Sequence, residues 1–69
     1  MKKVFVNGEY RELPDGARLT DAIAASGAPE DRRGLAVAVD GEVVPRGEWD
    51  TTTIDDGARV EVLRAIQGG

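Results

Sequence analysis

Cysteine and histidine are both absent from this 69-residue chain, and aromatic residues make up only 4% of it. Without cysteine the chain has no disulfide, no cysteine nucleophile and no thiolate metal site. Without histidine it also lacks the usual general base near neutral pH and the commonest metal ligand. We therefore expect a protein that is not itself an enzyme, that binds no metal or cofactor, and whose chemistry is catalysed by another protein.

Long apolar runs and an excess of positive charge are missing as well. No run approaches the roughly 20 apolar residues of a membrane span, and the residues after Met1 lack the apolar core of a signal peptide. The net charge of -4 repels nucleic-acid phosphates and anionic lipids. We therefore expect a cytoplasmic protein with no nucleic-acid or membrane partner. With 41% hydrophobic and 32% charged residues, the chain should fold as a single domain over residues 1–69.

Two turn dipeptides, each between short apolar segments, predict two β-hairpins. The first is Asn7-Gly8 and the second is Asp40-Gly41. Both favour the positive φ angles of a two-residue type I′ turn. The strands predicted around them, together with one last strand near the C-terminus, are 4–6, 9–13, 35–39, 42–44 and 59–66.

A helical period replaces the strand alternation between the two hairpins. Leu19, Ala22 and Ile23 fall on one face of a predicted helix, with Thr20 as the expected N-cap and Gly27 at its end. We therefore predict an α+β domain, with a mixed sheet of about five strands and one short helix packed on one face. This order of elements is that of a β-grasp fold with the last strand in the centre, although other small mixed sheets also fit it.

The chain ends in Gln67-Gly68-Gly69, directly after the last predicted strand. Two glycines bury nothing and cost conformational entropy, so they are poor structural material. They suit a thin, extended segment that enters a narrow active site. We therefore predict that residues 66–69 form a flexible tail that presents the Gly69 carboxylate. On composition alone, a frayed terminus without function fits equally well.

Strand alternation also predicts a surface for partners on the side of the sheet that faces away from the helix. The residues expected there, as a modest exposed apolar patch, are Phe5, Ala36, Ala38 and Leu63. Arg64 is added as a docking residue because it lies near the tail, and Ile66, the first residue of the tail, is added with it. The alternatives are that these are scattered surface apolar residues, or that the strand register differs by one residue from the predicted one. Trp49 is expected to anchor its irregular segment on the core.

Several stretches of the chain resemble the ThiS family of sulfur carriers from thiamin biosynthesis. They are VNGE, LPDGARLTDAIAASG, VAVDGEVVPRGEWDTT and DDGARVEVLRAIQGG, and they cover nearly the whole chain. The most specific parts are VPRGEW at residues 44–49 and the terminal QGG. The resemblance implies a ubiquitin-like β-grasp fold and a sulfur-carrying C-terminus, with Gly68 and Gly69 as the functional residues.

The resemblance also implies a cycle of partner enzymes. An E1-like adenylyltransferase of the ThiF type would adenylate the Gly69 carboxylate with ATP. A sulfur-donor enzyme would supply the sulfur of a thiocarboxylate, which is delivered to a thiazole synthase of the ThiG type. ATP and Mg²⁺ would be held by the activating partner, since this chain has no glycine-rich phosphate loop. The alternatives are a carrier for molybdopterin synthesis of the MoaD type, a ubiquitin-like modifier of lysines, and an interaction domain with an inert tail.

Overall fold

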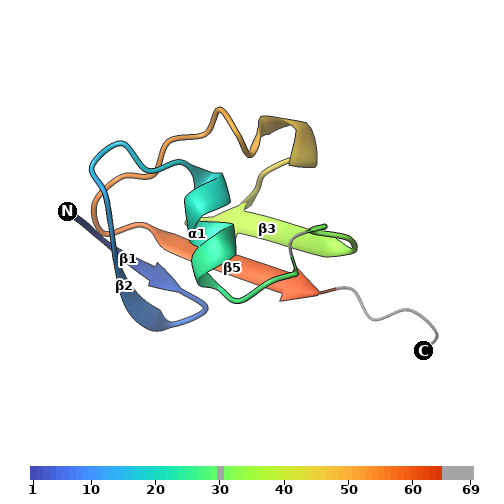
Figure 1. Ribbon diagram of the computed structural model, residues 1–69, viewed down its shortest axis with the longest axis horizontal. Helices are drawn as coiled ribbons and strands as arrows, with labels where there is room; N and C mark the ends of the chain where they lie inside the picture. The colour runs from blue at the N-terminus through green and yellow to red at the C-terminus, as the bar shows by residue number, and fades with distance from the viewer. Residues whose placement is uncertain (30, 65–69) are drawn as a thin grey trace.

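The computed structural model describes residues 1–29 and 31–64, which form a mixed sheet with one α-helix on one face (Figure 1). The sheet has five strands in the order β2-β1-β5-β3-β4, so that the last strand lies in the centre. The predicted α+β arrangement is therefore confirmed. In chain order the elements are β1 (Lys2–Val6), β2 (Glu9–Leu13), α1 (Leu19–Ala25), β3 (Leu35–Val39), β4 (Glu42–Val43), the 3₁₀ helix η1 (Arg46–Glu48) and β5 (Arg59–Arg64).

The two hairpin turns are formed as the sequence predicts. Asn7 and Asp40 have φ angles of 52° and 50°, and the glycine after each has a φ angle of 82° and 87° respectively. These are the left-handed conformations that a type I′ turn requires at both central residues. β4 is one residue shorter than predicted, because Val44 leaves the strand, although its N–H still donates to the Val37 carbonyl at 2.9 Å.

The start of α1 differs from the prediction, because its N-cap is Arg18 and not Thr20. Arg18 forms an isolated bridge with Thr53, and this pairing holds it in the extended conformation that an N-cap needs. The Asp21 carboxylate accepts the Arg18 backbone N–H at 2.8 Å. Thr20 therefore lies in the first turn of the helix. The helix stops at the predicted place, where Gly27 has a φ angle of 82°.

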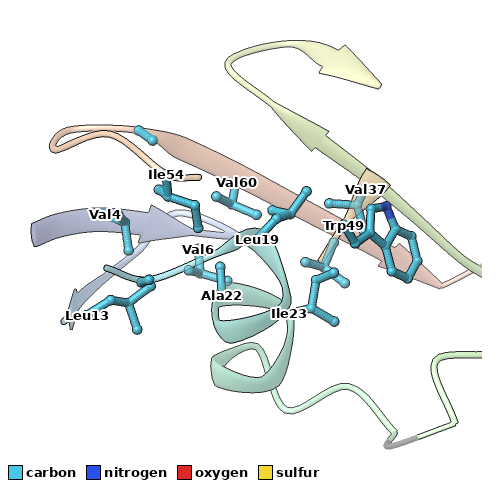
Figure 2. Close-up of a cluster of buried hydrophobic side chains, with 13 residues drawn as sticks. Val4, Val6, Leu13, Leu19, Ala22, Ile23, Val37, Trp49, Ile54 and Val60 are labelled. Carbon is cyan, nitrogen blue, oxygen red and sulfur yellow. The ribbon is translucent and has the colours of Figure 1, made fainter. Parts of the chain in front are cut away.

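The core lies between α1 and the face of the sheet that α1 covers (Figure 2). Leu19 and Ile23 of the helix pack there against valines of β1, β3 and β5. Trp49, after η1, is 3% exposed and its indole N–H donates to the Val44 carbonyl at 2.8 Å, so it anchors its segment as predicted. The buried apolar residues are Val4, Val6, Leu13, Ala17, Leu19, Ala22, Ile23, Val37, Trp49, Ile54, Ala58, Val60 and Val62.

Candidate functional site

The site predicted from sequence is the C-terminus, and the structure describes the strand that leads to it. Ile66, Gly68 and Gly69 lie outside the described residues. The predicted last strand, 59–66, is described as β5 up to Arg64. The geometry of the candidate site is therefore that of the end of β5 and of the surfaces around it.

β5 pairs with a neighbouring strand on each side, and one of its faces packs against the core. These contacts fix the position of its described part. It runs parallel to β1, with Val6 opposite Val60, and antiparallel to β3, with Leu35 opposite Arg64. The inward side chains of Val60 and Val62 are 1% and 8% exposed. Burial of two valines contributes about 3 to 6 kcal/mol in total relative to leaving them exposed. The end of β5 is thus fixed by strand pairing and by the core together.

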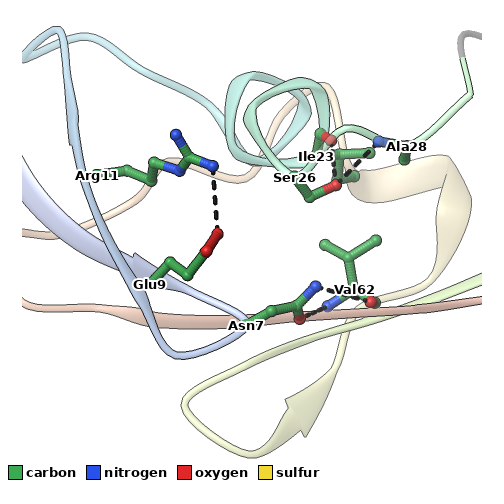
Figure 3. A network of polar contacts seen from close by, with 7 residues as sticks. All are labelled: Asn7, Glu9, Arg11, Ile23, Ser26, Ala28 and Val62. Atoms are coloured by element: carbon green, nitrogen blue, oxygen red, sulfur yellow. Dashed lines mark hydrogen bonds and ion pairs between the residues drawn. The ribbon is translucent and has the colours of Figure 1, made fainter.

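The side chain of Asn7 adds a further contact to the end of β5 (Figure 3). Its Oδ1 atom accepts the backbone N–H of Val62 at 2.8 Å, and its Nδ2 atom donates to the Val62 carbonyl at 3.2 Å. Its own backbone N–H donates to the Val60 carbonyl at 2.8 Å. The sequence predicted the turn at Asn7 but not this use of its side chain.

Three of the predicted docking residues meet on the outer face of the sheet, which faces away from α1. Ala36 lies opposite Leu63, and Ala38 lies opposite Val43 in the neighbouring pair of strands. We call these four residues, Ala36, Ala38, Val43 and Leu63, the outer-face patch. Leu63 and Val43 are 61% and 76% exposed, and the patch lines a shallow hollow of about 70 Å³ together with Glu61. Val43 was not among the predicted docking residues, although pairing across the Asp40-Gly41 turn places it beside Ala38.

Phe5 lies on the same outer face but apart from the outer-face patch. It pairs with Arg59, four residues before Leu63, and this offset is about 13 Å along the strand. Its ring packs edge-on against Tyr10 of β2, with 6.0 Å between the ring centroids. Partial desolvation, helped by the nearby Glu12 carboxylate, raises the pKa of Tyr10 above its usual value. Phe5 therefore belongs to an aromatic pair at the other end of the face.

Arg64 ends the described part of β5 and is exposed, as a residue beside the tail is expected to be. With Asn7, Leu35 and Val62 it lines a hollow of about 170 Å³ between the end of β5 and the C-terminal end of α1. The end of the strand thus has an apolar patch on one side of the sheet and a hollow with a positive charge on the other.

The described ranges, 1–29 and 31–64, contain neither a candidate metal site nor a helix that could span a membrane. No three His, Cys, Asp or Glu side chains are grouped there in a way that could hold a metal ion. None of the described helices has the length and apolar character to cross a membrane.

Comparisons with known proteins agree on one family. The model of the ThiS family matches residues 4–69. A crystal structure of the thiamine biosynthesis protein ThiS from Geobacter metallireducens is similar, with a TM-score of 0.77 and 29% identity, over 97% of this chain and 99% of that one. An NMR solution structure of a thiamine biosynthesis protein from Geobacter metallireducens has a TM-score of 0.73 and 29% identity, over 97% and 87% of the two chains. None of the curated proteins matches the chain.

Proposed function

The chain belongs to the ThiS family and is a ThiS-type sulfur carrier with a ubiquitin-like β-grasp fold, and we propose that it carries sulfur as a thiocarboxylate on Gly69. The observation that supports this most is the extent of the family match, which runs through Gly68 and Gly69 to the end of the chain. The central, firmly held β5 leads directly to these residues. Residues 1–69 then form one sulfur-carrier domain, with 66–69 as its tail.

Sulfur loading on a carboxylate takes two steps, because a carboxylate is a poor electrophile. A Gly69 carboxylate oxygen attacks the α-phosphorus of ATP, and pyrophosphate leaves. A hydrosulfide equivalent then attacks the carbonyl carbon, the bond to the phosphate oxygen of AMP breaks, and one proton is released. The products are the thiocarboxylate and AMP. In this proposal an E1-like adenylyltransferase catalyses the first step and holds ATP and Mg²⁺, and a sulfur-donor enzyme supplies the sulfur.

The carrier body docks its partners through the outer-face patch. Leu63 lies one residue before Arg64, so an enzyme bound on the patch has the start of the tail beside it. A standard interface buries about 800 Å² on each partner, and a footprint of that size centred on Leu63 also reaches Phe5. Phe5, Ala36, Ala38 and Leu63 then contribute apolar contacts, and we expect the enzyme to contact Arg64 and Ile66 as well, because these residues lie between Leu63 and Gly69 in the sequence.

The loaded carrier delivers its sulfur to a thiazole synthase. The thiocarboxylate sulfur adds to a carbonyl or imine carbon of the thiazole precursor, whose oxygen or nitrogen takes the electron pair and a proton. Water then hydrolyses the resulting thioester, which returns the Gly69 carboxylate and leaves the sulfur on the precursor as a thiol. A carrier for molybdopterin synthesis would use the same loading chemistry with another acceptor. A ubiquitin-like modifier would instead pass its acyl group to a lysine amine.

Incubation with a ThiF-type enzyme, ATP, Mg²⁺ and sulfide tests the loading step by intact mass. The protein is expected to gain the mass difference between sulfur and oxygen, about 16 Da, and to release one pyrophosphate per carrier. A variant without Gly69 keeps all the described structure and is expected to gain nothing. Conjugates of higher mass would indicate a modifier, and an unchanged mass together with no pyrophosphate release would refute the proposal.

A further inference from the structure

Asn7 is a residue of the first hairpin turn, and its side chain also contacts β5. This side chain extends the pairing of β1 with β5 beyond the point where the backbone turns away. The main-chain pairing of these strands ends with the Asn7 N–H, which donates to the Val60 carbonyl. The next peptide group on that side of β5 belongs to Val62. The Asn7 amide both accepts its N–H and donates to its carbonyl, as the next residue of a strand would (Figure 3).

The second hairpin offers an internal comparison. Asp40 occupies the same position of the same turn type, with a φ angle of 50° against 52° for Asn7. Its Oδ1 atom accepts the Arg59 N–H at 2.9 Å at the start of β5, and its own N–H donates to the Arg59 carbonyl at 2.8 Å. A side chain that only accepts is enough at Arg59, because the main chain supplies the donor there. At Val62 both a donor and an acceptor are needed from one side chain, and a carboxamide provides both.

The difference matters because the two contacts lie at opposite ends of β5. The Asp40 contact is at the entry of the strand, whereas Val62 is two residues before the described end at Arg64. Leu63 and Arg64, which follow, pair in register with β3. Within the described residues, the Asn7 amide is thus the contact nearest the end of β5 on the β1 side.

We propose that Asn7 is a positioning residue for the C-terminal carboxylate, and that it does so by holding β5 on its β1 side as far as Val62. This inference rests on the proposed function, since it concerns how the tail is presented to the activating enzyme. Without the amide, the strand end loosens back towards Val62. The partner must then order more of the chain before the carboxylate reaches ATP. Ordering the backbone of one further residue corresponds to a factor of about 5 to 30 in kcat/KM.

The test uses Asn7→Gly and Asp40→Gly as a matched pair in the full chain. Glycine accepts the positive φ angle without strain, so each variant keeps its turn and loses only the side-chain contact. Asn7→Asp is a third variant, similar in size, that keeps the acceptor and loses the donor. Pyrophosphate release with a ThiF-type enzyme and ATP gives kcat/KM for each carrier. Amide hydrogen exchange at residues 60–64 measures how well the end of β5 is protected against local opening, and circular dichroism checks that each variant is folded.

Asn7→Gly is expected to lower kcat/KM about 5- to 30-fold and to speed exchange of the Val62 amide about tenfold or more. Asp40→Gly is expected to leave kcat/KM at the wild-type value. Asn7→Asp is expected to have a kcat/KM between those of Asn7→Gly and the wild type. Equal kcat/KM for Asn7→Gly and wild type, or an equal loss in both glycine variants, overturns the inference. A wild-type carrier that is never activated refutes the proposed function instead. Unchanged Val62 exchange in Asn7→Gly then still overturns the positioning role.

Discussion

Replacing Leu63 by glutamate is expected to weaken activation of the carrier without unfolding it. Leu63 lies on the outer-face patch, 61% exposed, opposite Ala36 and one residue before the described end of β5. Its side chain contributes little to the core, which lies on the other face of the sheet. A change at this position therefore separates docking from folding.

The expected size of the effect follows from the exposed fraction of the side chain. Full burial of a leucine is worth about 1.5 to 3 kcal/mol, so the part still exposed can add about 1 to 2 kcal/mol on docking. Leu63→Ala should lose most of this, a factor of about 5 to 30 in kcat/KM. Leu63→Glu also places a charge in an apolar contact and beside Glu61, so its loss should be larger, about 100-fold. The free energy of unfolding should change by less than about 1 kcal/mol.

The assay is pyrophosphate release by a ThiF-type enzyme at varied carrier concentration, with urea unfolding of each variant alongside. Thr53→Glu is the control for added negative charge, since Thr53 is exposed but pairs with Arg18 beside the start of α1, not on the outer face. Its kcat/KM is expected to stay near the wild-type value. If Leu63→Glu is activated as well as Thr53→Glu, the outer-face patch does not dock the activating enzyme.

Three further substitutions test how the fold is held. Ile23→Ala empties a site in the core that is 1% exposed, and should lower the free energy of unfolding by about 2 to 5 kcal/mol in urea titrations. Trp49→Phe keeps most of the ring volume but removes the donor to the Val44 carbonyl, and should lower the free energy of unfolding by about 1 to 3 kcal/mol. Unfolding of this variant must be followed by circular dichroism, because Trp49 is the only tryptophan in the sequence. Asp40→Asn keeps both the left-handed tolerance and the acceptor for the Arg59 N–H, so it should change stability by less than about 0.5 kcal/mol, whereas a large loss would show that the charge matters.

Local chemistry made much of the fold predictable from the sequence. Asn-Gly and Asp-Gly fix the two turns because these residues themselves accept positive φ angles, and alternation then predicts which strand residues are buried. The same reasoning brought Ala36, Ala38 and Leu63 together. It could also have found Val43, since the position of the second turn determines what faces Ala38.

Contacts between distant segments were the part that the sequence did not reveal. The N-cap of the helix is Arg18 because that residue pairs with Thr53, a partner far along the chain. The Asn7 side chain contacts Val62, which is 55 residues away. Phe5 was expected beside the other outward residues, but the parallel register with β5 places it next to Arg59. Alternation predicts the face on which a residue lies, whereas its position along that face depends on strand register.

Fragmentation mass spectrometry of the loaded carrier tests the central claim most directly. After reaction with a ThiF-type enzyme, ATP and sulfide, every fragment that contains Gly69 is expected to carry the sulfur-for-oxygen mass difference. Fragments that end before Gly69 should be unchanged. A loaded protein whose extra mass lies on fragments without Gly69, or a chain activated with ATP that gains no sulfur at its C-terminus, would contradict the account.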